Sequence, residues 1–260
     1  MHETRPLLEA TGLVKSFGKV KALRGADFSV YAGEIVALVG DNGAGKSTLV
    51  KTLSGVHAPD AGSIVVDGVE VRDFHPLSAR RLGIETVYQD LALAPTLDPV
   101  ANLFLGREVL REGILGRFGF LDKRYMRAKA ESKFAELGVR IQDVASPISA
   151  MSGGQRQGVA VSRAAAWASK IIFLDEPTAA LGVVQTRSVL DLIRKVRDTG
   201  VGVVLISHSM PDVMAVSDRI EVMRLGKRVA RMITAGIKAE DVVAAMTGAT
   251  STTGDSNDEI

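Results

Sequence analysis

The chain has 260 residues, enough for one large domain or two small ones around a substantial core. Its hydrophobic content of 46% and its near balance of 32 basic and 30 acidic residues are typical of a soluble globular protein, and no basic excess indicates a nucleic-acid partner. There is no cysteine, no apolar run near the roughly 18 residues of a membrane helix and no apolar signal region, so we expect no disulfides, no export and no membrane insertion of the chain itself.

Short apolar runs alternate with longer helical patterns along the chain, which predicts an α/β fold with a parallel sheet. The first segments, 7–14, 26–30 and 63–66, alternate in polarity and suit an antiparallel sheet packed on the core. The runs 35–39, 84–88, 171–174 and 201–206 are apolar on both faces and predict buried strands. Between residues 90 and 167 the pattern is mostly helical, including a helix over 123–137.

These patterns predict one domain over 1–248 with a helical insertion. Its α/β core comprises 1–88 and 164–248, and its helical subdomain comprises 89–163. From Thr250 the tail lacks apolar residues until the final Ile260, and 249–260 is expected to be disordered.

A glycine-rich segment lies between the predicted strand 35–39 and a helical pattern that begins near Lys46. Residues 40–47 read GDNGAGKS and fit the phosphate-binding pattern G-x-x-x-x-G-K-[ST] in the strand–loop–helix context that it requires. Glycines let backbone N–H groups converge on an anion, and the helix N-terminus adds a positive dipole end. The alternative is a glycine-rich turn with a surface lysine, but the full pattern in this context predicts nucleoside triphosphate binding.

In this segment Lys46 is predicted to contact the β and γ phosphates, and Ser47 to offer its hydroxyl to Mg²⁺. The residues predicted to bind the nucleotide here are Gly40, Asp41, Asn42, Gly43, Ala44, Gly45, Lys46, Ser47 and Thr48.

Two adjacent carboxylates follow the apolar run 171–174. Asp175 and Glu176 are therefore predicted at the carboxyl edge of a central strand, where ligands of open α/β sheets bind. Adjacent residues of an extended chain point in different directions, so one carboxylate can face a metal and the other the γ-phosphate. We assign Asp175 as a Mg²⁺ ligand and Glu176 as the general base. Taken alone, the pair could also be two solvated acids at a strand end, an alternative that the neighbouring phosphate loop disfavours.

A third signal is MSGGQRQ at residues 151–157. Ser152 and Gln155 have the S-x-x-Q spacing of a capping box, which predicts a helix from Ser152 to about residue 167. A capped N-terminus with two glycines also exposes N–H donors and a positive dipole end to phosphate. The chain therefore carries two surfaces suited to phosphate.

The order of GDNGAGKS, YQD, MSGGQ, IIFLDE and SH resembles the ATP-binding subunit of an ABC transporter, and the likeness covers the chain to about residue 248. The SGGQ segment separates this family from other phosphate-loop ATPases. The resemblance implies a RecA-like parallel-sheet core, an N-terminal antiparallel β-subdomain and an inserted helical subdomain. It also implies a head-to-tail homodimer, in which Ser152, Gly153, Gly154 and Gln155 of one copy close over the ATP held by the glycine loop of the other.

The same resemblance assigns roles to four more residues. Phe17 matches the aromatic residue that stacks on adenine, with Val20 on the same side; a phenylalanine in a sheet core is the alternative. Gln89 matches the glutamine that contacts Mg²⁺ and the attacking water, and in isolation would be a surface glutamine. His208 matches the histidine that contacts the γ-phosphate, and by itself could bond a backbone group. The predicted catalytic residues are Glu176, His208 and Gln89, and the predicted Mg²⁺ ligands are Ser47, Gln89 and Asp175.

One position departs from the family pattern. Many relatives have an aspartate after EPT-x-A-L where this chain has Gly182, which puts the coupling of two ATP sites by that loop in doubt. Met151 replaces a commoner leucine, an apolar change of similar size that should matter little. The segment 107–133 has eight Lys or Arg against four Asp or Glu. It is expected to be a solvated helix face, with a permease contact as the alternative.

The resemblance also implies a function. The chain is expected to hydrolyse Mg-ATP at the cytoplasmic face of the inner membrane and to drive a separate permease supplied by an extracytoplasmic sugar-binding protein. Segments 88–108 and 240–248 resemble importers of ribose, xylose and fructose, and a single ATPase unit suits fructose-type systems, so we expect monosaccharide import with fructose favoured. The alternatives are import of another small solute, an ABC-type ATPase without transport, and a regulatory module without turnover. The compact chain argues against an ABC-type ATPase without transport. The intact pair Asp175 and Glu176 argues against a regulatory module without turnover.

Overall fold

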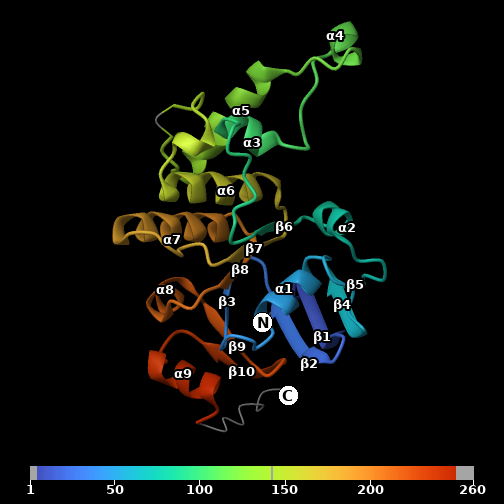
Figure 1. Ribbon diagram of the computed structural model, residues 1–260, viewed down its shortest axis with the longest axis vertical. Helices are drawn as coiled ribbons and strands as arrows, with labels where there is room; N and C mark the ends of the chain where they lie inside the picture. Colours follow the sequence, from blue (N-terminus) through green and yellow to red (C-terminus); the bar gives the residue numbers. More distant parts are fainter. Residues whose placement is uncertain (1–4, 142, 250–260) are drawn as a thin grey trace.

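The computed structural model describes residues 5–141 and 143–249, which form two β-sheets with helices around them (Figure 1). The larger sheet has the strand order β10-β9-β3-β8-β7-β6. Its strands are β3 (Ile35–Val39), β6 (Ile84–Val87), β7 (Ile171–Asp175), β8 (Gly202–Ile206), β9 (Arg219–Arg224) and β10 (Lys227–Ile233). Neighbours from β9 to β6 are parallel, and β10 pairs antiparallel with β9.

The four predicted core strands are confirmed to within one residue at each end. Every residue of β3 and β8 is buried, as expected for central strands covered on both faces. The sequence analysis assigned no strand to β9 or β10. In β9 charged residues alternate with apolar ones, yet two of those charged residues, Arg219 and Glu221, are buried.

The smaller sheet confirms the predicted antiparallel segments. It consists of β1 (Leu8–Phe17), β2 (Val20–Val30), β4 (Ala61–Val66) and β5 (Val69–Glu70), in the order β2-β1-β4-β5. All neighbouring pairs are antiparallel. Its buried face, with Leu8 and Leu13 from β1, packs in one apolar cluster with Leu38 of β3 and Leu49 of the first helix.

The helices begin and end at recognisable signals. They are α1 (Lys46–Leu53), α2 (Pro76–Arg81), α3 (Pro99–Phe104), α4 (Gly113–Arg117), α5 (Lys123–Leu137), α6 (Gly153–Trp167), α7 (Val183–Asp198), α8 (Met210–Val216) and α9 (Ala239–Thr247), with a 3-10 turn η1 (Ile148–Ala150). The predicted helix 123–137 matches α5: Asp122 caps it by accepting from the N–H of Tyr125, and Gly138 ends it at φ 73°. The predicted helix after Ser152 matches α6.

Helix α6 joins the helical part of the chain to the large sheet. Phe104 of α3 and Phe134 of α5 pack with Val159 of α6 in one apolar cluster, whereas Val161 of α6 packs with Ile172 of β7 in another. Figure 1 shows α6 and α7 between the sheet and α3 and α5, with α4 at the far end from α9. The predicted boundary between 163 and 164 falls within α6, so the subdomain limits remain a prediction.

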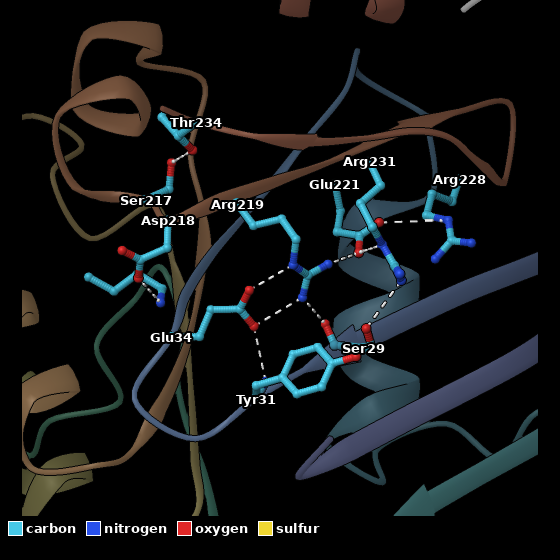
Figure 2. A network of polar contacts seen from close by, with 11 residues as sticks. Ser29, Tyr31, Glu34, Ser217, Asp218, Arg219, Glu221, Arg228, Arg231 and Thr234 are labelled. Atoms are coloured by element: carbon cyan, nitrogen blue, oxygen red, sulfur yellow. Dashed lines mark hydrogen bonds and ion pairs between the residues drawn. The ribbon is translucent and has the colours of Figure 1, made fainter. Parts of the chain in front are cut away.

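A buried network of charged side chains ties the two sheets together (Figure 2). Arg219 of β9 donates to Oε1 of Glu34 at 2.7 Å and to the carbonyl oxygen of Ser29 at 2.8 Å, and it pairs with Glu221. Glu221 also accepts from Nε of Arg231 in β10 at 2.9 Å. Because Ser29 lies in β2 and Glu34 directly precedes β3, the network ties β9 and β10 of the larger sheet to β2 of the smaller sheet and to the start of β3.

Over residues 5–141 and 143–249, no helix combines the length and the apolar character needed to cross a membrane. The predicted tail 249–260 lies, apart from its first residue, outside the described residues.

Candidate active site

The glycine-rich segment 40–47 forms the loop between β3 and α1, as predicted. Gly40 and Gly45 have φ of 151° and 101°, values that residues with a side chain rarely adopt. A Cβ atom on Gly40 would lie 2.3 Å from the carbonyl oxygen of Met223, and one on Gly45 would lie 2.6 Å from that of Ala22. Glycine is therefore required at both positions by conformation and by close backbone contact.

At the end of this loop, the backbone N–H groups of the first turn of α1 have no capping side chain. Asp41, Asn42, Gly43 and Ser47 are exposed, whereas Ala44 is buried beneath them. The N-cap of α1 is Gly45, which supplies no capping side chain, so the N–H groups of the first turn are left for a ligand or water. This arrangement fits a bound phosphate.

Lys46 folds back over the loop and is only 7% exposed. Its Nζ donates to the carbonyl oxygens of Gly40 at 2.6 Å and Asp41 at 3.0 Å. Burial lowers the pKa of Lys46, and the nearby carboxylates of Glu176, Asp41 and Asp175 oppose that shift. The ammonium group is therefore held at the loop, within the electrostatic influence of the two carboxylates that follow β7.

The two predicted carboxylates lie at the end of β7. Asp175 is the last residue of the strand, and Glu176 has φ 51°, which turns the chain sharply away from it. Nε2 of His208 lies 3.0 Å from Oε1 of Glu176, and the backbone N–H of His208 donates to Oε2 at 3.4 Å. Despite this short contact, Oε1 is buried and accepts no hydrogen bond from any described residue. A water molecule would satisfy such an oxygen.

Burial raises the pKa of both carboxyl groups. For Glu176, His208 opposes the shift and the charge of Asp175 adds to it. For Asp175, the positive charges of Lys51, His208 and Lys46 oppose it. A carboxylate with a raised pKa is a stronger base, which suits a residue that accepts a proton from water.

The strand order explains why segments far apart in the sequence meet. β3, β8 and β7 are consecutive parallel neighbours, so the loops after their carboxyl ends lie side by side. Those loops carry the glycine-rich segment, His208, and the pair Asp175 and Glu176. β6 is the next strand, and the exposed Gln89 follows it by two residues at the same edge.

Phe17 and Val20 lie opposite one another at the end of the β1–β2 hairpin. They are 45% and 66% exposed, so the alternative of a sheet-core phenylalanine is wrong. The ring of Phe17 meets that of His57 edge to face, with centroids 5.1 Å apart, a contact that the sequence analysis did not anticipate. Both side chains are therefore accessible to a ligand.

The turn between β9 and β10 connects this hairpin to the glycine-rich loop. The N–H of Gly226 donates to the carbonyl oxygen of Ala44 at 2.9 Å, and its own carbonyl oxygen accepts from the N–H of Arg24 in β2 at 2.8 Å. Because β9 and β10 are absent from the predicted strands, this link between the hairpin and the glycine-rich loop was not predicted. The glycine after Leu225, in an otherwise alternating segment, is the turn signal that indicates it.

Ser152 and Gln155 form the predicted capping box at the start of α6. The N–H of Ser152 donates to Oε1 of Gln155 at 2.9 Å, and the N–H of Gln155 donates to Oγ of Ser152 at 3.3 Å. With Gly154 and the N-terminal part of α7, these residues line a cavity of about 360 Å³. Among the described residues, no hydrogen bond joins this segment to the glycine-rich loop, and Figure 1 shows α6 and α1 in separate parts of the molecule.

Two further details concern the loop after Glu176. Gly182 is the N-cap of α7 and, having no side chain, leaves that helix without a side-chain cap. Thr178 donates its hydroxyl to Oδ2 of Asp212 in α8 at 2.7 Å, which ties this loop to the one carrying His208. Asp212 is not among the predicted site residues, although its S-x-x-D spacing from the N-cap Ser209 is a helix-start signal.

Comparisons with known proteins agree with this geometry. Residues 23–179, more than half of the chain, match the family model described as ABC transporter. The chain is 51% identical to a fructose import ATP-binding protein of Rhizobium meliloti, over 94% of this chain and 95% of that one. It is 45% identical to a xylose/arabinose import ATP-binding protein of Sulfolobus acidocaldarius, covering 93% and 94%. A ribose import ATP-binding protein of Rubrobacter xylanophilus is 39% identical, but this chain spans only 47% of its length.

Solved structures show the same fold. A nucleotide-free ATP-binding cassette from an ABC transporter superposes with a TM-score of 0.76 at 24% identity, over 92% of this chain and 96% of that one. A cassette of an ABC transporter complex from Clostridium perfringens gives 0.75 at 23% identity, over 94% and 95%. The chain belongs to the ABC transporter family and is one of its ATP-binding, ATP-hydrolysing subunits.

Proposed function

We propose that this chain hydrolyses ATP to power uptake of a monosaccharide through a separate permease, with fructose as the favoured cargo. The observation that supports fructose as the cargo is the 51% identity to the fructose import protein over nearly the full length of both chains. The xylose/arabinose and ribose relatives support the monosaccharide class. The single ATPase unit is shared with the fructose and xylose/arabinose relatives, since this chain covers 95% and 94% of them.

ATP would be held by two parts of the site. Lys46 and the N–H groups of residues 40–48 suit the triphosphate, and the exposed Phe17 and Val20 suit the adenine base. Mg²⁺, when bound, would neutralise charge on the phosphate oxygens. The oxygen ligands available for it are those of Ser47, Gln89 and Asp175. Within the described residues no three His, Asp or Glu side chains cluster as a metal site, which fits an ion that shares its coordination with phosphate.

Glu176 would act as the general base. Its free Oε1 can accept the proton of a water molecule whose oxygen attacks the γ-phosphorus, while the bond to the leaving ADP breaks. The backbone N–H of His208 donates to the other oxygen, Oε2, at 3.4 Å and would keep this carboxylate in place. We assign the contact with the γ-phosphate to the side chain of His208, which is 59% exposed.

A second copy of the chain would complete each ATP site. Ser152, Gly153, Gly154 and Gln155 present a helix N-terminus, and within the described part of the chain no hydrogen bond joins them to their own glycine-rich loop. We expect Glu176→Gln, which retains ATP, to elute as a dimer with ATP and as a monomer without it. Lys46→Ala, which loses a phosphate contact, should stay monomeric as the matched control. A persistent monomer of Glu176→Gln at saturating ATP would contradict the dimer.

The permease would be contacted by the helical subdomain, residues 89–163. The segment 107–133 exposes apolar side chains beside its basic ones: Ile114 is 73% and Phe118 77% exposed. Exposed apolar groups of this size favour a partner surface over simple solvation. This contact would hold the chain peripherally at the cytoplasmic face of the inner membrane, with a sugar-binding protein delivering cargo from the other side.

Uptake measurements in a deletion strain test the cargo. Loss of this chain should abolish high-affinity uptake of one labelled sugar among fructose, xylose and ribose, while amino-acid and metal uptake stay intact. Wild-type chain should restore uptake, and Glu176→Gln should not. Normal entry of all three sugars into the deletion strain would overturn the cargo assignment and leave the ATPase assignment standing.

A further inference from the structure

The loop after β6 contains two successive residues in an unfavourable conformation. Leu91 and Ala92 have φ of 62° and 45°, in the left-handed region that residues with a Cβ atom enter at a cost. The N–H of Leu91 donates to the carbonyl oxygen of Tyr88 at 2.8 Å, which closes a turn around Gln89. Strained residues of this kind persist only where surrounding contacts hold them.

Arg163 of α6 makes those contacts. Its Nη1 donates to the carbonyl oxygen of Ala92 at 2.7 Å, and its Nη2 donates to that of Leu91 at 3.0 Å. A planar guanidinium can hold two adjacent carbonyl groups, whereas an ammonium group acts as a single point charge. Among the described residues, Arg163 forms no salt bridge; the carboxylate of Glu85 influences it from farther away and is itself paired with Arg107.

The next part of the loop is held from α3. The side chain of the buried Asn102 accepts from the N–H of Ala94 at 2.7 Å and donates to its carbonyl oxygen at 3.0 Å. The loop is therefore fixed by the turn at Tyr88, by Arg163 and by Asn102. Of these three, the contact from Arg163 comes from α6, the helix that Ser152 caps. Arg163 follows Ser152 by eleven residues, or about three helical turns.

We propose that Arg163 is a positioning residue for ATP hydrolysis: by fixing Leu91 and Ala92 it sets the place of Gln89 at the sheet edge beside Asp175 and Glu176. This inference rests on the proposed catalytic role of Gln89. Arg163 touches neither nucleotide nor water in this scheme. It acts through the loop, and it ties the position of Gln89 to the helix that begins with the SGGQ segment.

Steady-state kinetics with matched arginine variants test the proposal. Arg163→Ala should lower kcat by about 5-fold to about 50-fold, because a small displacement of a positioned group slows the chemical step. Its Kd for ATP should stay within about twofold, since the phosphate loop is untouched. Arg163→Lys should fall between wild type and Arg163→Ala. Arg194→Ala removes a similar guanidinium contact, to the carbonyl oxygen of Ala215 at 2.9 Å, and should keep normal kcat.

A double-mutant cycle separates positioning from a general structural role. If Arg163 acts through Gln89, adding Arg163→Ala to Gln89→Ala should lower kcat no further. The positioning role would be overturned if the kcat losses of the two single variants multiply in the double variant, or if Arg163→Ala keeps a normal kcat. A normal kcat in Gln89→Ala would show that Gln89 has no catalytic role, and the positioning role of Arg163 would fall with it. If thermal melts show that Arg163→Ala is not folded, Arg163→Lys replaces it in the same double-mutant cycle with Gln89→Ala.

Discussion

At the scale of single residues, the site depends on partly buried charges. Lys46, Asp175 and Glu176 all lie where burial disfavours the charged form. Lys46 and the two carboxylates partly compensate one another, whereas the charge of Asp175 adds to the raised pKa of Glu176. Glu176 combines a left-handed backbone, a neighbouring histidine and one oxygen without a hydrogen bond. These features support the proposed role of Glu176 as the general base.

Replacing this carboxylate should affect turnover but not binding. We expect Glu176→Gln to lower kcat by at least about 10²-fold, because the amide cannot accept the proton of the attacking water. The Kd for ATP should be nearly unchanged, since the amide has the size and shape of the acid. Phosphate release under saturating ATP measures the first effect and nucleotide titration the second. Near-normal hydrolysis would contradict the general-base assignment.

The raised pKa of Glu176 predicts a pH dependence. Hydrolysis needs the deprotonated carboxylate, so kcat should fall as the pH drops through this pKa, which lies above the usual value for a glutamic acid. Profiles of kcat between about pH 4 and about pH 8 would show this acid limb. Circular dichroism over the same range serves as the control for unfolding. A kcat independent of pH down to the ordinary glutamate value would show that burial does not raise this pKa.

At the scale of elements, local signals predict boundaries well when the signal is a cap or a loop motif. The helices α5 and α6 begin after Asp122 and Ser152 because each side chain accepts from an N–H of the first turn. The glycine-rich loop appears where its pattern predicts, and its glycines are fixed by φ and by backbone contacts. Strand β9 was missed because its charged residues suggest an exposed segment, although two of them are buried.

Glycine 45 allows a test of the loop geometry. Gly45→Ala should raise the Kd for ATP by at least about 10-fold, because a Cβ at φ 101° would meet the carbonyl oxygen of Ala22 at 2.6 Å and displace the start of α1. Gly200→Ala is the matched control: its φ is 91°, but no atom lies within 4 Å of the added Cβ. Both variants should lose about 1 kcal/mol or more of stability, and only Gly45→Ala should lose affinity. Equal affinities in calorimetric titrations would refute the steric requirement.

At the scale of the whole molecule, the buried network in Figure 2 holds the two sheets together. Glu221 is fully buried and faces Arg219, Arg228 and Arg231. The same strands end in the turn whose Gly226 connects the phosphate loop to β2. The position of the β1–β2 hairpin relative to the phosphate loop therefore depends on charges far from both in the sequence.

Removing one charge of this network should be costly. Glu221→Ala should lower the free energy of unfolding by about 3 kcal/mol or more, because Arg219 keeps a buried charge with fewer partners. Glu136→Ala, which removes an exposed ion pair with Lys133 on α5, should cost less than about 1 kcal/mol. Denaturant unfolding of both variants gives the comparison. Equal losses in the two would mean that the network adds little to stability.

The sequence by itself determined the phosphate loop, the Asp175–Glu176 pair, the capped start of α6 and the central strands, because each of these is encoded by residues close together in the chain. It also determined the family, through the order of those motifs. Only the tertiary structure decided that Phe17 is exposed, that His208 contacts Glu176, that Arg163 holds the loop after Gln89, and that β9 and β10 carry a buried ion network. Those facts depend on strand order and on contacts between distant segments, which local periodicity and spacing do not encode.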